Sequence, residues 1–420
     1  MTTATVTAAR AARARSRAGV RRERGPVAYP LLLAVLALVA VGVVMVYSAS
    51  SVREYLGSND PAAEGLQQAV WAALGLGACY LFSRVDFRLL RHLATPGYFL
   101  SLLLLGAVLV FGTEAFGSRR WFVIPGVGSF QPAEAAKLAI VVYLAHWLDR
   151  RGRAAGSFWN GMVPFAMLVA PGFLLIALEP DLGTAGVYAA AALSVFFMAG
   201  ANLVHLTLIG SATLAAAIAF VTANAYQLKR VETFLDPFRD PLGSGYNTLQ
   251  GLMALALGGI TGLGLGASRQ KYLYLPAPST DFIFAIIGEE WGLVGTLTVV
   301  ALFVVVAYQG YRIAIKAPDT FSGLLAAGIT TWIIVQACIN MMVVTALLPV
   351  TGIPLPFISY GGSALTINLI AIGILLSISR ETQTEGSLLH AVFDLGRRNR
   401  RAHLPRAGRR QGPARRPTRR

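Results

Sequence analysis

The sequence contains ten apolar runs separated by more polar segments, and each run is long enough to cross a bilayer as a helix. A bilayer core about 30 Å thick needs roughly 20 apolar residues in a helix. Backbone groups in lipid must be hydrogen-bonded within the spanning structure, which favours helices. Only 13% of the 420 residues are charged, against about a quarter in soluble domains. We therefore predict an all-α polytopic membrane protein of about ten transmembrane helices. The runs are residues 27–48, 65–83, 95–111, 132–148, 161–178, 183–199, 203–223, 282–313, 321–347 and 363–379.

The Lys and Arg residues are distributed unevenly between the two sides that this topology defines. The side of the two tails carries 27 of the 36 Lys and Arg, and the opposite side carries eight. Basic loops face the cytoplasm, so both termini are expected there. We predict two basic, disordered cytoplasmic tails (1–26 and 381–420) that contact anionic membrane lipids, around a transmembrane domain at 27–380. The first run is long enough to span, so no cleavable signal peptide is expected.

The net charge of +16 does not indicate nucleic-acid binding, because it is concentrated in tails that accompany no folded basic segment. Cys79 and Cys338 both lie in apolar runs, so we expect buried thiols and neither a disulfide nor a metal site. The five His residues have no ligand spacing. No zinc site is predicted.

Two outer loops, 112–131 and 224–281, carry the polar features of interest. The second is too long for a simple connector, which is typical of a functional loop. Within it, residues 246–258 predict a short amphipathic helix on or dipping into the membrane. The glycine-rich residues 260–268 would allow the backbone to approach a ligand closely.

Asp281 is a lone carboxylate where a polar loop meets an apolar run. A carboxylate at a membrane boundary is costly unless it has a partner or a function. Asp281 could cap the following helix, act as a base, or do both. Glu289 and Glu290 follow about two turns later, and we expect them to pair with Lys137 or with an Arg of the same cleft.

The first outer loop ends in a second group of ionisable side chains. Glu134 and Lys137 are three residues apart and share one helix face. They form either a self-neutralising pair or the wall of a polar cleft, and we favour the cleft. Arg119, Arg120 and Trp121 precede them. The indole is either an interfacial anchor or a surface on which a sugar stacks.

Two further segments complete the polar set. Glu179 and Asp181 flank a tight turn, where Asp181 is either an N-cap or a ligand and Glu179 has no capping role. Residues 348–363 are rich in Pro and Gly and carry the hydroxyls of Ser359, Tyr360 and Ser363. Such backbone at membrane depth lines a cavity or packs within protein.

Together these segments suggest a carboxylate base that works beside cations on an anionic, membrane-held substrate with a phosphate leaving group. A lipid transporter would explain the charges equally well, although transporters tend to bind at mid-membrane and these groups gather near the outer face. A structural scaffold is a third interpretation.

Several ordered motifs resemble the SEDS family, the group of FtsW, RodA and SpoVE, over residues 29–380, and most closely its division member FtsW. They are YSAS at 47–50, RW at 120–121, QPAE at 131–134 with Lys137, EPDLGT at 179–184, QK at 270–271, TDFIF at 280–284, GEE at 288–290 and PLPFISYGGS at 354–363.

The resemblance implies the SEDS fold in a bacterial cytoplasmic membrane. It also implies a peptidoglycan glycosyltransferase that polymerises lipid II into β-1,4 strands at the division septum. An elongation polymerase of the RodA kind and a lipid II flippase are the alternatives. By the same resemblance Asp281 is the essential carboxylate, and Glu134 and Lys137 are the family's charged pair. The family's usual Glu and His are replaced by Ala277 and Ser279.

Inversion at the donor carbon suggests one direct displacement with Asp281 as general base. The leaving diphosphate would be stabilised by Lys137, Arg119, Arg120, Lys271 or a divalent ion (Mg²⁺ or Mn²⁺). The resemblance implies as partners a class B penicillin-binding transpeptidase and regulators of the FtsQ, FtsL and FtsB kind. The predicted substrate-binding residues are Arg119, Arg120, Trp121, Gln131, Glu134, Lys137, Glu179, Asp181, Lys271, Glu289, Glu290, Ser359, Tyr360 and Ser363.

Overall fold

A long helix corresponds to each of the ten predicted spans. The computed structural model describes residues 28–115, 118–124 and 128–381, so the predicted tails lie outside the described residues. The spans are α2 (Tyr29–Ser58), α3 (Ala63–Arg84), α4 (Leu90–Phe111), α5 (Pro132–Arg151), α6 (Val163–Leu178), α7 (Leu182–Met198), α8 (Leu203–Ala223), α11 (Ile283–Ile315), α12 (Thr320–Val344) and α13 (Gly362–Ser379). Short 3-10 and π segments, Phe87–Leu89, Gly152–Gly156 and Phe158–Met162, lie at the ends near α4, α5 and α6.

Length and composition allow seven of the described helical segments to cross a membrane. Five are α2, α8, α11, α12 and α13, and two are α4 and α6 together with the short segments before them, Phe87–Phe111 and Phe158–Leu178. The other three have physical reasons for a weaker signal. The helix α7 is apolar but has 17 residues. The helix α3 begins beside Glu64 and ends at Arg84, and α5 carries Glu134 and Lys137 in its first turns. The predicted polytopic α-helical fold is confirmed.

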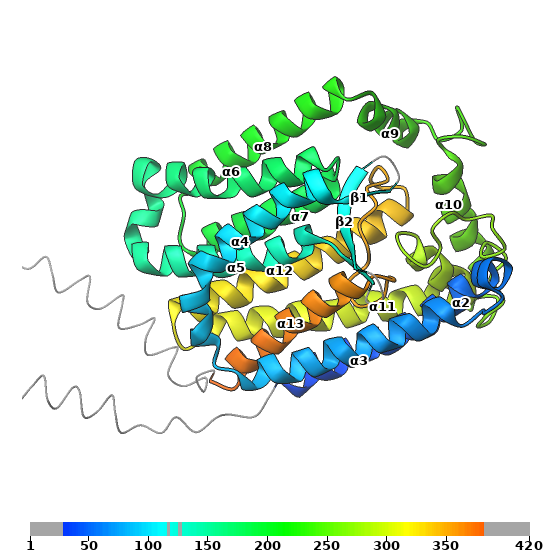
Figure 1. The fold of residues 1–420 in the computed structure, drawn as a ribbon, viewed down its shortest axis with the longest axis horizontal. Coiled ribbons are helices and arrows are strands. Elements are labelled where there is room, and N and C mark those ends of the chain that lie inside the picture. Colours follow the sequence, from blue (N-terminus) through cyan, green and yellow to red (C-terminus); the bar gives the residue numbers. More distant parts are fainter. Residues whose placement is uncertain (1–27, 116–117, 125–127, 382–420) are drawn as a thin grey trace, which may run out of the picture. The chain divides into compact units, whose positions relative to one another are not determined.

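Small residues allow the central helices to pack closely. The helices α3 and α13 lie side by side, and α11 runs next to α12 and α2 (Figure 1). A Cβ on Gly75 of α3 would lie 2.5 Å from the side chain of Leu369, and one on Gly373 of α13 would lie 2.5 Å from the carbonyl of Cys79. Close backbone approach of this kind supplies the van der Waals packing that holds helices together in lipid.

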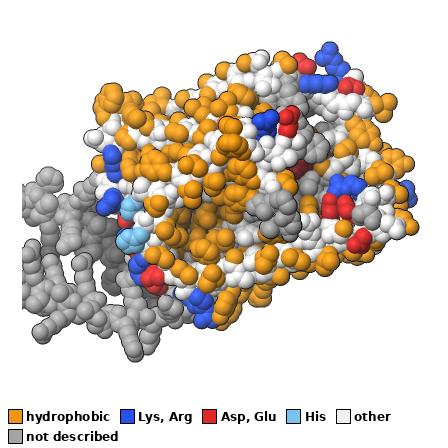
Figure 2. Space-filling model, in the orientation of Figure 1, with side chains coloured by type: hydrophobic (Ala, Val, Ile, Leu, Met, Phe, Trp, Pro, Cys, Tyr) orange, Lys and Arg blue, Asp and Glu red, His pale blue; other side chains and the backbone are white. Residues whose placement is uncertain are grey.

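The outer surface of the bundle is apolar. Hydrophobic side chains cover most of the face in Figure 2, between two groups of charged side chains. The helix α8 lies at the edge of the bundle and has no buried residue (Figure 1). The prediction of two buried thiols is confirmed for Cys79 and wrong for Cys338, which is exposed. An apolar run in lipid has one face outside the protein, so apolar context alone does not predict burial.

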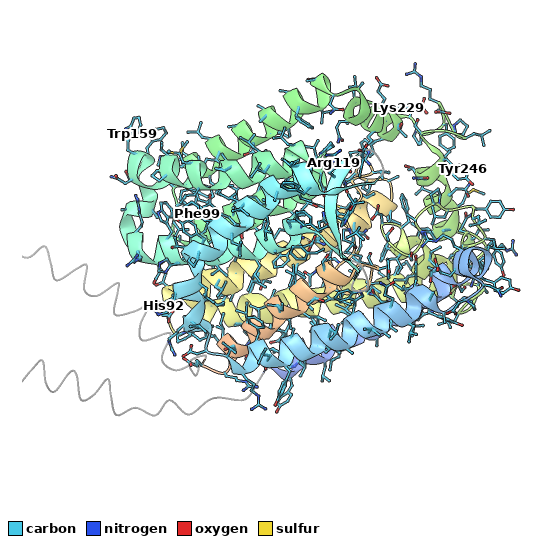
Figure 3. The ribbon with its side chains drawn as sticks, in the orientation of Figure 1. His92, Phe99, Arg119, Trp159, Lys229 and Tyr246 are labelled. Atoms are coloured by element: carbon cyan, nitrogen blue, oxygen red, sulfur yellow. The ribbon has the colours of Figure 1, made fainter. Side chains whose placement is uncertain are left out.

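The helix α12 connects the two ends of the bundle and is anchored at its start. Asp319 and Ser322 form a capping box there. Arg91, which lies in the first turn of α4, pairs with Asp319 at 3.1 Å. Loops of the predicted cytoplasmic and outer sides gather at opposite ends. In Figure 3, His92 and Trp159 lie toward one end, and Lys229 and Tyr246 toward the other.

The first outer loop forms a small antiparallel sheet that the all-α prediction did not contain. Its strands are β1 (Thr113–Ala115), β2 (Ser118–Ile124) and β3 (Gly128–Phe130), in the order β1-β2-β3. Trp121 pairs with Thr113, and Phe122 pairs with Phe130. A run of aromatic and β-branched residues in β2 was the available sequence signal.

The second outer loop contains α9 (Ala225–Leu235) and α10 (Tyr246–Gly258). The predicted helix at 246–258 is confirmed, and it packs against protein. A Cβ on Gly258 would lie 1.8 Å from the carbonyl of Gly288 in α11. The predicted single span at 282–313 is interrupted, because Gly292 has φ of 65° and only glycine adopts such a backbone readily.

Candidate active site

Asp281 lies in the loop directly before α11, with a half-buried side chain. The prediction that it caps α11 is wrong. The helix begins at Ile283, its capping residue is Phe282, and no side chain caps it. The backbone carbonyl of Asp281 accepts a hydrogen bond of 2.8 Å from Nδ2 of Asn340, which also donates to the carbonyl of Ile353 at 2.8 Å. The backbone of Asp281 is therefore fixed by α12, while its carboxylate serves no cap.

The Pro- and Gly-rich segment 348–363 holds the Asp281 loop in place. The Ser359 hydroxyl donates to the carbonyl of Thr280 at 2.7 Å and accepts from the backbone N–H of Leu355 at 2.8 Å. The backbone N–H of Tyr360 donates to the carbonyl of Ser279 at 2.9 Å. The non-helical backbone at this depth is thus satisfied by protein groups, as membrane burial requires.

Helix α3 supports the same loop from its other side. Gln68 donates to the carbonyl of Ser359 at 3.2 Å, and the Tyr360 hydroxyl donates to Gln67 at 2.6 Å. The hydroxyl of Ser279 donates to Glu64 at 2.9 Å. The hydroxyls of Ser359 and Tyr360 are thus engaged in supporting the loop.

Four charged groups influence one another at this site. Burial raises the pKa of Asp281 to about 6, the negative charge of Asp181 raises it too, and Arg230 and Arg120 oppose that rise. A Cβ built on Gly352 would lie 3.5 Å from Oδ2 of Asp281, so bare backbone borders the carboxylate. A carboxyl group with a pKa near 6 is largely ionised at neutral pH and is basic enough to take a proton.

Asp181 has the predicted capping role, and its role as a ligand stays a prediction. It caps α7, since its carboxylate accepts from the N–H of Thr184 at 3.0 Å and from the hydroxyl at 2.9 Å. It also accepts a hydrogen bond from Gln131 at 3.3 Å and lies 3.8 Å from Arg120. The backbone N–H of Gln131 in turn donates to the Ser363 hydroxyl at 3.3 Å. These contacts connect the first outer loop to the α6–α7 turn and to the start of α13.

Arg120 is committed to the α6–α7 turn. Its guanidinium donates to the carbonyls of Glu179 and Pro180, each at 2.8 Å. The Glu179 carboxyl is buried, and neither of its oxygens has a hydrogen-bond partner among the described residues. Burial, together with the charge of Asp181, raises the pKa of Glu179 to about 8, and Arg120 opposes this. The carboxyl is therefore mostly protonated at neutral pH.

Glu134 and Lys137 form a buried pair, and the favoured interpretation of a cleft wall is not what the structure shows. Each side chain is 1% exposed, and the ammonium donates to Glu134 at 2.7 Å. It also donates to Oε1 of Gln336 at 2.7 Å. Gln336 donates in turn to the carbonyl of Pro354 at 3.0 Å. The pair is desolvated and internally satisfied, so it links α5 to α12 and to the segment below Asp281.

The two glutamates of α11 were predicted to pair with Lys137 or with an arginine. Among the contacts of the described residues they pair with neither of these side chains. Glu289 accepts from the Ser268 hydroxyl at 2.5 Å, and Glu290 lies 3.8 Å from Lys271. Lys271 is buried and also donates to the carbonyl of Gly266 at 2.6 Å. Glu289 and Glu290 follow Asp281 by eight and nine positions, roughly 12 Å along a helix.

The glycine-rich segment 260–268 is used within the protein. Backbone N–H groups of Leu263 and Gly264 donate to the carbonyls of Glu289 and Glu290 at 3.0 Å each. A Cβ on Gly262 would lie 2.1 Å from the carbonyl of Glu290. The close approach expected toward a ligand is therefore an approach to α11.

Arg119 and Trp121 lie on β2 of the small sheet. Arg119 is exposed, donates to the carbonyl of Val110 at 3.2 Å and lies 3.6 Å from Glu114. Trp121 is half-buried. Both interpretations of Trp121, as an anchor and as a stacking surface, stay predictions.

Sequence reasoning missed a cavity of about 380 Å³ beside this site. It lies between α9, α10 and the segment that follows α12. The adjacent cations Lys229 and Arg230 on α9 were available as a signal, but they entered only the charge count of the outer loops. The amides Gln336 and Asn340 were also missed, although two amides one turn apart in an apolar helix indicate a buried polar contact. The cavity is lined by Lys229, Arg230, Thr233, Phe234, Ser244, Asn247, Thr248, Leu348, Pro349 and Val350.

The side chains do not form a dedicated metal cage in the described ranges, where no three His, Cys, Asp or Glu residues are grouped to hold an ion. Mg²⁺ commonly uses one or two carboxylates together with substrate phosphates and water.

Proteins of known family resemble the chain over most of its length. The profile of the FtsW/RodA/SpoVE family, described as "Cell cycle protein", matches residues 29–384. Stage V sporulation protein E of Bacillus subtilis is 41% identical over 354 residues, which is 83% of this chain and 96% of that protein. A probable peptidoglycan glycosyltransferase FtsW of Mycobacterium tuberculosis is 40% identical over 400 residues, covering 94% of this chain and 75% of that protein.

Solved structures agree with the sequence matches. A chain from a peptidoglycan synthase complex, studied for the coordination of polymerization and crosslinking, superposes with a TM-score of 0.70 at 32% identity, covering 85% of this chain and 98% of that one. The rod shape determining protein RodA of Thermus thermophilus gives a TM-score of 0.64 at 30% identity, with 86% and 99% covered. The chain therefore belongs to the SEDS family of polytopic membrane proteins, the family of FtsW, RodA and SpoVE.

Proposed function

We propose that this protein polymerises lipid II into β-1,4-linked glycan strands, with Asp281 as the general base. The coarser function, peptidoglycan glycosyltransferase, rests on its relatives. The observation that supports the finer proposal is the state of the Asp281 carboxylate. It caps no helix, its backbone is fixed by Asn340, and burial raises its pKa to about 6. These properties suit a group that must be ionised at neutral pH and still accept a proton.

In the proposed reaction the 4-hydroxyl of the acceptor sugar attacks the anomeric carbon of the donor. Asp281 takes the proton from this hydroxyl as the new carbon–oxygen bond forms. The bond from the anomeric carbon to the lipid diphosphate breaks at the same time, and the diphosphate leaves with the bonding electron pair. This single displacement inverts an α-linked donor to a β-linked product. A positioned base contributes about 10²–10⁴-fold to the rate, and alignment of two membrane-held substrates contributes much of the rest.

Septal cell-wall synthesis is the setting that we propose, in the bacterial cytoplasmic membrane. Relatives named FtsW support it. The similarity to a sporulation protein and to RodA keeps an elongation-type polymerase as the alternative. Depletion of the protein in its host separates the two, because loss of a septal enzyme gives filaments and loss of an elongation enzyme gives round cells.

We also propose that a class B penicillin-binding transpeptidase works with this chain, together with regulators of the FtsQ, FtsL and FtsB kind. A structural relative comes from a complex that couples polymerization to crosslinking, which supports the first of these partners. Mg²⁺ or Mn²⁺ is proposed as a companion of the substrate phosphates. Loss of polymer on chelation, with recovery on adding back either ion, would support that part.

The direct test is polymerisation of labelled lipid II by the purified protein, with and without its transpeptidase. We expect Asp281→Asn to lower turnover by about 10²–10⁴-fold. Asp60→Asn is the matched control, because Asp60 is an exposed aspartate in another turn of the same outer side. Normal polymer from a folded Asp281→Asn protein would rule out the base. Lipid II translocation in liposomes without any polymer would favour a transporter.

A further inference from the structure

The cavity beside α9 has the composition of an anion-binding site. Its volume is about 380 Å³, within the range of small-molecule pockets. Lys229 and Arg230 supply two cations on adjacent residues of α9. Asn247 and Thr248 of α10 add amide and hydroxyl groups. Ser244, which precedes α10, also lines the cavity, and its hydroxyl donates to Asp240 at 3.3 Å. Figure 3 shows Lys229 and Tyr246, which begins α10, at the same end of the bundle.

The cations predicted for the leaving group make contacts within the protein. The exposed Arg119 donates to the carbonyl of Val110 and lies 3.6 Å from Glu114. Lys137 is 1% exposed and bonded to Glu134 and Gln336. Lys271 is 5% exposed and directed to a backbone carbonyl and to Glu290. Arg120 donates to two carbonyls of the α6–α7 turn. An anion that enters the site from outside would need to displace these contacts. Lys229 and Arg230 line a cavity, and Lys229 interacts electrostatically with the nearby Asp240.

The cavity is adjacent to the Asp281 loop. Arg230 lines it and also acts electrostatically on Asp281, where it opposes the rise in pKa. Val350 lines it as well, and Gly352, two residues later, borders the Asp281 carboxylate. On the other side, a Cβ on Gly251 of α10 would lie 3.1 Å from the ring of Phe282. The base and the cavity therefore share one wall.

We propose that this cavity binds the diphosphate of the donor, the leaving group of the reaction, through Lys229 and Arg230. The inference rests on the proposed function and names the subsite that would stabilise the departing charge. Charge-assisted contacts to phosphate oxygens are among the stronger hydrogen bonds in proteins. Arginine can bind such oxygens in a bidentate manner, and lysine acts as a point charge.

Distance along the substrates favours the donor over the acceptor. The diphosphate of the donor is attached to the carbon under attack, so it stays within a few bonds of the hydroxyl that Asp281 deprotonates. The diphosphate of a lipid II acceptor is separated from its attacking 4-hydroxyl by a whole disaccharide. A cation that influences Asp281 electrostatically, as Arg230 does, is therefore placed for the donor.

The test uses the full-length protein with its transpeptidase and two readouts. The first is direct binding of undecaprenyl diphosphate, with undecaprenyl monophosphate as the comparison. The second is inhibition of polymerisation by the same two lipids. Lys229→Gln and Arg230→Gln are each expected to weaken diphosphate binding by about tenfold or more. The conservative variants Lys229→Arg and Arg230→Lys should retain much of it. Arg239→Gln, an exposed cation of the same outer loop, should bind within about twofold of wild type.

The outcomes separate this inference from the proposed function. If wild type polymerises lipid II and the Lys229→Gln/Arg230→Gln variant binds diphosphate like Arg239→Gln, the subsite is wrong and the polymerase stands. If the double variant loses diphosphate binding but wild type makes no polymer, the subsite stands and the polymerase fails. Equal affinity for monophosphate, or equal competition by phosphatidylglycerol vesicles, would overturn the diphosphate assignment in favour of a general lipid headgroup site.

Discussion

The pH dependence of polymerisation is the most direct consequence of the Asp281 environment. A general base works in its deprotonated form, so the rate is lost as the pH falls through its pKa. That pKa is about 6, against an ordinary value of 3.8. The deprotonated fraction of Asp281 is then about nine-tenths at pH 7 and about one-tenth at pH 5, so kcat/KM should fall about tenfold between these values. An aspartate with the ordinary pKa would lose roughly a twentieth over the same range.

Two substitutions should move the low-pH fall in kcat/KM, the acid limb of the profile, in opposite directions. Asp181→Asn removes a negative charge that raises the pKa of Asp281, so the limb should move to lower pH. Asparagine is also a good N-cap, so α7 should keep its start. Arg230→Gln removes a positive charge that lowers the same pKa, so the limb should move to higher pH. Glu179→Gln should leave the limb in place. The pKa of Glu179 is about 8, so this carboxyl is already mostly neutral between pH 5 and pH 7.

The assay is the initial rate of polymer formation from labelled lipid II at subsaturating concentration, at constant ionic strength from pH 5 to pH 8. Thermal unfolding at each pH controls for loss of folded protein. A flat profile between pH 7 and pH 5 would refute the assignment of Asp281. Shifts of the limb in the same direction for Asp181→Asn and Arg230→Gln would refute the electrostatic argument while leaving the base possible.

Three further predictions follow from the packing. Lys137→Met should destabilise the protein by about 3–5 kcal/mol because it leaves a buried carboxylate unpaired, and adding Glu134→Gln should recover part of this loss in thermal unfolding. Gly258→Ala should lower the free energy of unfolding by about 1–3 kcal/mol, because its Cβ would overlap a carbonyl of α11. The control Gly106→Ala, whose Cβ has nothing within 4 Å, should unfold at the temperature of wild type or above it. Asn340→Ala should lower kcat by up to about 10²-fold with little change in KM, since a small displacement of the base is costly; an unchanged kcat would contradict its positioning role.

The transmembrane helices were predictable because each carries its own signal. A run of apolar residues specifies a helix in lipid without reference to any other part of the chain. Asp281 could be found for a related reason, since a lone carboxylate at the end of an apolar run is conspicuous. The cap of α7 by Asp181 is also local, because its partner Thr184 lies three residues away.

The features that sequence reasoning missed depend on partners distant in the chain. Lys137 meets Gln336 across 199 positions, and no spacing rule predicts that contact. Whether Glu134 and Lys137 line a cleft or are buried is decided by α12. The break of α11 at Gly292 depends on the glycine-rich segment that fits against it. The cavity is formed by two helices and a loop. The sequence therefore shows its cations but does not show that they line one cavity.

The helix α12 gives the reacting end of the molecule a mechanical connection to the other end. Its 25 residues form a stiff rod of about 37 Å. One end is tied to Arg91 through Asp319, and the other holds the backbone of Asp281 through Asn340. A rod of this kind transmits tilt and rotation with little loss, so a force applied at the Arg91 end would re-aim the Asp281 carboxylate. The proposed chemistry at one end of the bundle is thereby mechanically linked to the opposite end.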